Sequence, residues 1–186
     1  NRIYKDWKQC TDEFFDQLGT ESFYGLDFGI SSPTAVVEVK YDGDKTFYVK
    51  EILYKPMSLM GMPLHEYLLK PRGVKQKPLI NPECRVICDS AKKTMVTDLA
   101  KGGLLAIPAL KGAGSISRTI GNVQSFKIVY TESSENLRTE YFEYSWKLDR
   151  YGLAEEIPAS NQNDHLLDAN GYVISYAINY LGIGFL

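Results

Sequence analysis

The sequence predicts an α/β fold in which a mixed sheet of five or more strands has helices on both faces. Three segments rich in β-branched and aromatic residues (22–29, 34–40 and 46–54) follow one another with short links, which is typical of an antiparallel meander. Farther along the chain, compact apolar strands alternate with helical segments, which favours parallel strands joined by helical crossovers.

Length and composition indicate one domain with an ordinary core. The chain has 186 residues, is 44% hydrophobic and has a formal net charge of -2, so a nucleic-acid surface would have to be local. No apolar run approaches the length of a membrane span, so we expect no membrane partner. Three cysteines fit a reducing compartment better than a disulfide framework, and Cys84 and Cys88 lack the second ligand pair that a zinc site needs.

The first half of the chain supplies the meander. We expect residues 1–21 to be a lead-in that contains a short amphipathic helix around residues 12–15. Within residues 22–29, Tyr24, Leu26 and Phe28 alternate as strand formers. Asp42-Gly43 predicts the hairpin turn between the strands 34–40 and 46–54.

The second half alternates between helices and strands. Glycines close one helix at residues 102–103, Ser115 can cap another, and Asn163 or Asp164 can cap the last. The expected elements are a helix at 63–70, a basic loop at 71–82, a strand at 84–89, a helix from 90 or 91 to 101, a strand at 104–109, a glycine-rich loop at 111–115, a helix to about 126, a strand at 127–130, a helix at 134–144, a hairpin at 145–158 and a final helix from about 163.

Three aspartates carry the candidate chemistry. Asp27 lies inside an apolar strand, Asp89 ends another, and Asp168 lies near the start of the last helix, one turn after His165. If the two strands are neighbours, the carboxylates can meet, and their mutual repulsion would be relieved by a divalent cation. Oxygen ligands favour Mg²⁺ or Mn²⁺, and two such ions can activate a water for attack on a phosphodiester.

Simpler interpretations exist for each of these features. Asp27 could cap a turn at a strand end, Asp89 could be a helix N-cap, and His165 could be a solvated surface residue. The loop at 111–115 could bind phosphate through its backbone or could be an ordinary linker.

Five stretches, in this order, resemble the nuclease domain of the large terminase subunit, the DNA-packaging protein of tailed bacteriophages. They are Tyr24-Gly25-Leu26-Asp27-Phe28-Gly29, Cys88-Asp89-Ser90-Ala91, Lys111-Gly112-Ala113-Gly114-Ser115-Ile116, Tyr144-Ser145-Trp146-Lys147 and Asp164-His165-Leu166-Leu167-Asp168-Ala169. The resemblance extends from about Tyr24 to Tyr180, and it implies a ribonuclease H-like fold for residues 22–186.

The resemblance also implies a function. Asp27, Asp89 and Asp168 would bind two Mg²⁺ or Mn²⁺ ions, with His165 at a position where the family often has a histidine or an acid. The activity would be metal-dependent cleavage of double-stranded DNA, a concatemeric viral genome, in the host cytoplasm. Full-length members carry an ATPase domain first and work with a portal protein and a small terminase subunit. The motor motif G-x-x-x-x-G-K-[ST] does not occur in this sequence, so residues 1–21 are expected to follow a missing ATPase domain.

DNA contacts are expected to be non-specific and to the backbone, because no base-reading element is recognisable. The candidates are Lys92, Lys93, Lys111, Lys147 and Arg150.

Three other classes of protein deserve comparison. Resolvases and transposases are the nearest enzymatic alternative, although they typically bear separate DNA-recognition domains. The segment 25–32 also resembles the phosphate loop of actin and Hsp70 ATPases, which need two lobes and a much longer chain. A catalytically inactive binding module is disfavoured by the three intact carboxylates.

Overall fold

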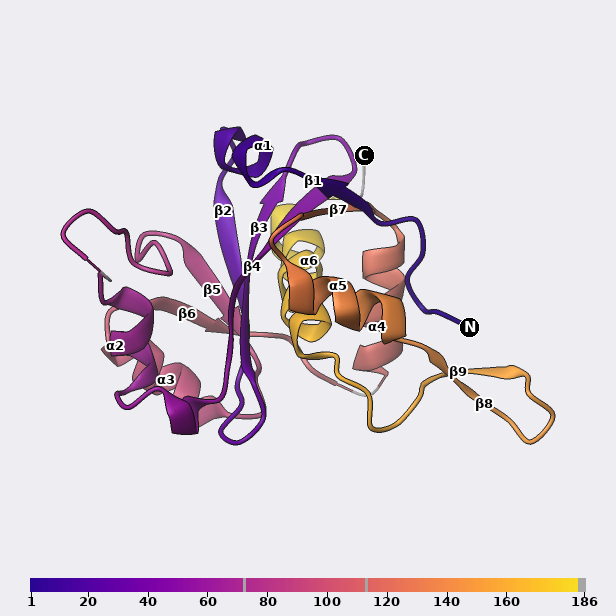
Figure 1. The fold of residues 1–186 in the computed structure, drawn as a ribbon. Helices are drawn as coiled ribbons and strands as arrows, with labels where there is room; N and C mark the ends of the chain where they lie inside the picture. Colours follow the sequence, from indigo (N-terminus) through magenta and orange to yellow (C-terminus); the bar gives the residue numbers. More distant parts are fainter. Residues whose placement is uncertain (72, 113, 184–186) are drawn as a thin grey trace.

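The structure, a computed structural model, describes residues 1–71, 73–112 and 114–183. Within these residues the main sheet has seven strands in the order β1-β7-β4-β3-β2-β5-β6 (Figure 1). Their bounds are β1 Lys8–Cys10, β2 Ser22–Asp27, β3 Thr34–Tyr41, β4 Thr46–Lys55, β5 Arg85–Cys88, β6 Leu105–Pro108 and β7 Lys127–Thr131. The predicted mixed sheet is confirmed.

The antiparallel meander is formed by β2, β3 and β4. The turn between β3 and β4 is the one that Asp42-Gly43 predicts. Gly43 has a φ of +84°, which side-chain-bearing residues rarely adopt, and Asp42 Oδ1 accepts hydrogen bonds from the backbone N–H groups of Asp44 and Thr46. This turn fixes the register of the meander.

The remaining strand pairs are parallel. β5 lies beside β2 and β6 beside β5, while β7 lies beside β4 and β1 beside β7. The two strands that end near Asp27 and Asp89 were expected to be neighbours, and the parallel pairing of β2 with β5 confirms this. Parallel neighbours end at the same edge of the sheet, so Asp27 and Asp89 lie at adjacent strand ends.

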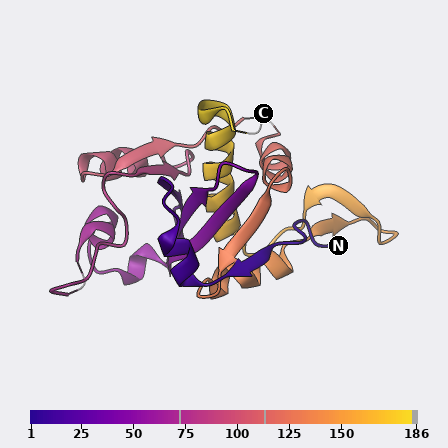
Figure 2. The same cartoon turned by 90° about the horizontal axis from the view of Figure 1, so that it is seen from above.

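Helices cover both faces, as predicted. The bounds are α1 Asp12–Gln17, α2 Leu64–Leu69, α3 Lys93–Lys101, α4 Ser115–Gln124, α5 Glu135–Glu143 and α6 His165–Leu181, with a short 3-10 turn η1 at Met57–Leu59. α2 and α3 lie on one side of the sheet and α4, α5 and α6 on the other (Figure 1), where α4 runs beside α6 (Figure 2). Two buried clusters of apolar side chains therefore sandwich the sheet.

The expected hairpin at 145–158 is present as β8 Trp146–Leu148 and β9 Ala154–Pro158, which project from the body (Figure 1). The loop at 71–82 has no helix or strand over its described residues, and Arg72 lies outside them. No helix in the described part of the chain is long and apolar enough to cross a membrane.

The expected lead-in packs on the folded body. β1 pairs with β7 at the edge of the sheet, Ile3 and Tyr4 are buried, and the predicted short helix is α1. Residues 1–21 thus contribute an edge strand and core side chains, a role that a three-residue strand does not reveal by its sequence pattern.

Two helix starts differ from the sequence expectation. α3 begins at Lys93, after a turn at residues 90–91, and not at Ser90 or Ala91. α4 begins at Ser115, but its N-cap residue is Gly114, in the left-handed region with a φ of +72°, and no side chain makes a capping hydrogen bond there. The prediction that Ser115 caps this helix is wrong, because glycine reaches a backbone conformation that carries the chain into the helix without a side-chain cap.

Candidate metal centre

Asp27 is held on the α6 side of the sheet by the alternation of β2. Tyr24 and Leu26 enter the cluster beneath α2 and α3, so Gly25 and Asp27 face α6. A Cβ atom on Gly25 would overlap the carbonyl oxygen of Ala169 in α6. Glycine at this position therefore lets α6 lie directly on β2, which brings the first turn of α6 beside the Asp27 carboxylate.

Asp89 continues the parallel pairing of β5 with β2. Its backbone N–H donates to the carbonyl oxygen of Leu26 at 2.9 Å, and the residue is 9% exposed, as is Asp27. Its Oδ1 accepts from the N–H of Ala91 at 3.0 Å and contacts the ammonium of Lys111. Asp89 therefore caps a turn between β5 and α3, and it is not the N-cap of α3, which is Lys92.

His165 pairs with Asp27. Its Nδ1 lies 3.0 Å from Asp27 Oδ2, and the hydrogen bond to this carboxylate raises the pKa of the imidazole from its usual value against the opposing effect of burial. The interpretation of His165 as a solvated surface residue is wrong, since the side chain is 23% exposed and bonded to a buried acid.

Asp168 lies among other acids. Burial, followed by the negative charges of Asp164, Asp27 and Glu140, raises the pKa of its carboxyl to about 8, while Lys111 acts in the opposite direction. A carboxyl in this environment tends to keep its proton near neutral pH unless a further cation arrives. Asp168 on α6 thus feels the charge of Asp27 on the neighbouring strand β2.

Glu140 is an acid of this neighbourhood that sequence reasoning missed. It is 1% exposed, and its Oε2 accepts from the N–H groups of Leu166 and Leu167 at 2.8 and 3.1 Å. Burial raises its pKa to about 7. Glu140, not Asn163 or Asp164, therefore satisfies the first N–H groups of α6.

The N-cap residue of α6 is Asp164, as expected, but its side chain makes no capping hydrogen bond. A signal for Glu140 exists in the sequence. Leu137, Glu140 and Tyr141 recur at helical spacing, so Glu140 belongs to the buried face of α5.

The described side chains do not enclose an ion as they stand. Among residues 1–71, 73–112 and 114–183, no three histidine, cysteine or acidic side chains converge into a ready set of ligands. Two of the candidate ligands are instead paired within the protein, Asp27 with His165 and Asp89 with Lys111. The donor set fits Mg²⁺ or Mn²⁺ by its chemistry, because it consists of carboxylate oxygens, the hard ligands that these ions prefer.

The five basic candidates for DNA binding lie on three different elements. Lys111 belongs to the carboxylate site, and Lys92 and Lys93 are exposed at the start of α3. Lys147 pairs with Glu155 across the hairpin at 2.7 Å, and the guanidinium of Arg150 lies 4.8 Å from the ring centre of Tyr151 at its tip. Of the five, Lys111 is thus the one that pairs with a site acid in the described part of the chain.

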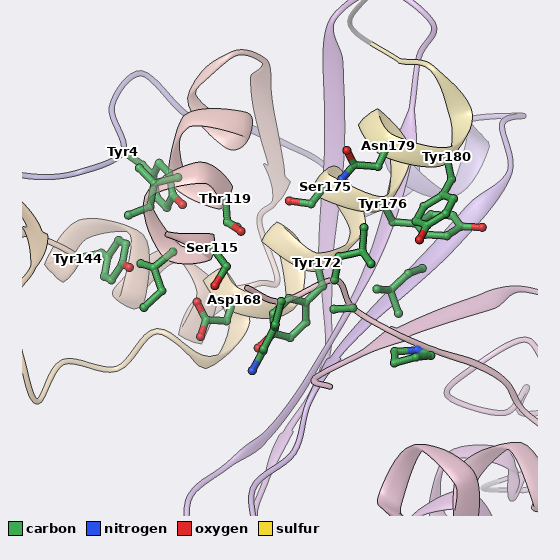
Figure 3. Close-up of a pocket in the computed structure, with 17 residues that line it drawn as sticks. Tyr4, Ser115, Thr119, Tyr144, Asp168, Tyr172, Ser175, Tyr176, Asn179 and Tyr180 are labelled. Atoms are coloured by element: carbon green, nitrogen blue, oxygen red, sulfur yellow. The ribbon is translucent and has the colours of Figure 1, made fainter. Parts of the chain in front are cut away.

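A cleft opens beside the site. It has a volume of about 320 Å³, and Asp168, Lys111 and Tyr172 are among the residues that line it. Figure 3 shows Asp168 and Tyr172 side by side. Ser115 of the expected glycine-rich loop also lines it, and Ala113 of that loop lies outside the described residues. Lys111 and Ser115 of this loop thus line the cleft, and Lys111 also pairs with Asp89.

Comparison with known proteins identifies similar chains. No family model matches. The chain is 28% identical to the large terminase subunit of Escherichia phage T5 over 94% of its own length, and it spans 39% of that relative. The nuclease domain of the large terminase g2p from bacteriophage SPP1, solved with bound Mn, matches with a TM-score of 0.76 at 19% identity, over 96% of this chain and 99% of that one.

Two further solved structures have the same fold. The nuclease domain of the P22 large terminase matches with a TM-score of 0.58 at 17% identity, over 92% of this chain and 90% of that one. The large terminase nuclease from the thermophilic phage G20c, with bound magnesium, matches with a TM-score of 0.58 at 11% identity, over 86% of this chain and 82% of that one. The resemblance drawn from the five sequence stretches is thus confirmed: the chain has the ribonuclease H-like fold of large terminase nuclease domains and is similar in sequence to a large terminase subunit.

Proposed function

We propose that this chain is the nuclease part of a phage DNA-packaging protein and that it hydrolyses phosphodiester bonds of double-stranded DNA with divalent metal ions. The observation that supports the proposal is the placement of two aspartates at adjacent strand ends, beside the first turn of α6. Asp27 and Asp89 end adjacent parallel strands, and Asp168 lies in the first turn of the helix packed on Gly25. The relatives whose names include large terminase support the same conclusion.

In this proposal Asp27, Asp89 and Asp168 hold two Mg²⁺ or Mn²⁺ ions. Related nuclease domains have been solved with Mn and with magnesium, which supports this choice of metals. When bound, the ions would supply an activated water and stabilise the leaving oxygen of the cleaved bond.

The protein's own groups prepare the site. Asp27 is fixed by His165, so its second oxygen is left for another partner. Lys111 neutralises Asp89 while no stronger cation is present, and it lies on the wall of the cleft, where a DNA phosphate could take the place of Asp89. Asp168, whose pKa is raised to about 8 by burial and then by the neighbouring acids, would release its proton as a cation binds.

The substrate and the partners follow from the same proposal. Double-stranded DNA would be held through its backbone by Lys92, Lys93, Lys147 and Arg150, without base specificity. The longer protein would include an ATPase domain ahead of residues 22–186 and would work with a portal protein and a small terminase subunit in the host cytoplasm.

A plasmid assay tests the proposal. The purified chain should nick and linearise supercoiled plasmid with Mn²⁺ or Mg²⁺ and be silent with EDTA. Asp27→Ala should abolish cleavage while circular dichroism shows a folded protein. Asp98→Ala, which removes an exposed acid of α3, is the matched control and should cut at the wild-type rate.

Cleavage that continues unchanged in EDTA would refute the metal mechanism. Wild-type cleavage by folded Asp27→Ala would refute the assignment of the site.

A further inference from the structure

One side of α6 carries a row of tyrosines that begins at the candidate metal site. Asp168, Tyr172, Tyr176 and Tyr180 recur at every fourth residue, so they follow one another along the helix. Tyr172 and Tyr176 are half-buried, while Tyr180 is 59% exposed. Figure 3 shows Tyr172 beside Asp168, with Tyr176 and Tyr180 farther along the same helix.

These tyrosines line the cleft of about 320 Å³ whose opposite wall is formed by α4 and the end of β6. Leu110 and Ile116 also line the cleft, and each of these large apolar side chains is 62% exposed. Thr119, Ser175 and Asn179 add hydroxyl and amide groups. The cleft therefore offers aromatic and apolar surfaces together with a few hydrogen-bonding groups, a combination typical of small-ligand sites.

Two cations lie beside tyrosines of this row. The Lys111 ammonium lies 5.9 Å from the ring centre of Tyr172. The guanidinium of Arg85 lies 6.0 Å from the ring centre of Tyr176 and donates from its Nη1 to the Tyr176 hydroxyl at 3.3 Å. A ligand that combines a flat ring, a polar edge and negative charges on both sides of the ring would satisfy all of these groups.

We propose that this cleft binds an unpaired nucleobase of the DNA strand that is cut, by stacking the base on the exposed ring of Tyr180 and placing its flanking phosphates near Arg85 and Lys111. This inference rests on the proposed function, because it names a subsite for the same substrate. The faces of a paired base are hidden in the duplex stack. The cleft therefore selects a nucleotide that has left the stack, and it adds base stacking to the backbone contacts of the duplex.

Replacement of Tyr180 can distinguish stacking of a base from a purely structural role of the tyrosines. Tyr176 also contacts Phe23 and Arg85, so its loss would affect the fold as well as a ligand. Tyr180 contacts Tyr176 with ring centres 4.9 Å apart and leaves most of its surface in solvent. Removal of its ring therefore costs the fold little, while a stacked base would lose a partner.

The test is a binding measurement in EDTA, where no cleavage is expected. The probe is a single strand of about twelve nucleotides, a length within the range bound by single-strand binders, with 2-aminopurine at its centre. Stacking on an aromatic ring should quench the fluorescence of this base. We expect quenching with the wild type and with Tyr180→Phe, and a dissociation constant about 5- to 150-fold higher with Tyr180→Ala, the range given by ~1–3 kcal/mol per stacked base.

Phe14→Ala is the matched control, because it removes another half-exposed aromatic ring, on α1. It should bind and quench as the wild type does. Equal quenching and equal affinity for folded Tyr180→Ala and wild type would overturn the inference, as would an equal loss in Phe14→Ala.

The outcome is independent of the test of the proposed function. If plasmid cleavage requires Mn²⁺ while Tyr180→Ala binds the probe normally, the subsite is refuted and the nuclease proposal stands. If the chain does not cut plasmid but stacking depends on Tyr180, the cleft binds an unpaired base while the nuclease proposal is refuted, so the base belongs to no cut strand.

Discussion

Replacement of Asp168 by asparagine should stabilise the metal-free protein. Asp168 is surrounded by Asp164, Asp27 and Glu140, and burial together with these charges raises its pKa from 3.8 to about 8. Asparagine has nearly the shape of the protonated acid and cannot ionise, so it removes the charge that the site disfavours. The change should therefore cost catalysis in the proposed nuclease and increase resistance to unfolding.

The magnitude follows from linkage between protonation and folding. The folded protein binds this proton more tightly than the unfolded chain, so the associated stability is complete below about pH 4 and is lost as the pH rises through about 8. Between these limits the free energy of unfolding of the wild type falls with rising pH, by up to ~4 kcal/mol at about pH 7. Asp168→Asn should escape this loss, and its melting temperature should exceed that of the wild type by roughly 10 °C at neutral pH.

The effect can be measured by urea and thermal unfolding in EDTA. Circular dichroism follows the unfolding at several pH values from about 4 to 8. The difference between variant and wild type should be close to zero at the acid end and grow with pH. Asp98→Asn, at an exposed position on α3, should show no such growth. A difference that is the same at every pH would refute the electrostatic reasoning, and so would a variant less stable than the wild type at neutral pH.

Two further predictions concern the packing of α6 and the binding of DNA. Gly25→Ala should destabilise the fold by ~1–3 kcal/mol in urea unfolding, because its Cβ would overlap the Ala169 carbonyl oxygen. Gly19→Ala is the control and should not destabilise the fold, because no atom lies within 4 Å of the added Cβ. Equal stability of the two variants would contradict the close approach of β2 and α6. Binding to two unrelated duplexes should be equally weak, with Kd ~10⁻⁴–10⁻⁶ M and a steep loss with salt; nanomolar binding to one sequence would show that bases are read.

The sheet could be predicted from the sequence because its signals are local. The meander strands are rich in β-branched residues, and Asp42-Gly43 marks their turn. The same holds for most helices, whose predicted ends differ from the structure by a few residues, as at the start of α3. The parallel pairing of β2 with β5 was a condition of the carboxylate hypothesis, and a right-handed crossover through helices makes such a pairing common.

The edge strand β1 and the cap of α6 could not be predicted in this way. β1 has three residues, too few to show a period, and its partner β7 lies more than a hundred residues away. Glu140 caps α6 from another helix, so no residue next to the start of α6 announces it. Features that depend on contacts between distant segments leave weak local patterns, although the buried face of α5 did contain Glu140.

In the candidate site, the acids could be found from local sequence patterns, whereas the ion pair of Lys111 could not. An aspartate inside an apolar strand is conspicuous, because burial makes its charge costly, so Asp27 was found by pattern. Lys111 lies in a glycine-rich loop, where a lysine is ordinary, and the sequence suggested a DNA contact for it. In the folded chain its ammonium pairs with Asp89.

The pairing of Lys111 bears on how metal and DNA would act together in the proposed nuclease. An ammonium engaged with Asp89 has fewer donors left for a phosphate. A divalent ion at Asp89 would compete with Lys111 for the same carboxylate, since it carries twice the charge on a smaller centre. Lys111 would then be free to contact the backbone of a strand in the adjoining cleft. In this proposal, metal and DNA would therefore favour each other's binding through one side chain, and the ion pair with Asp89 and the DNA contact would be two states of the same lysine.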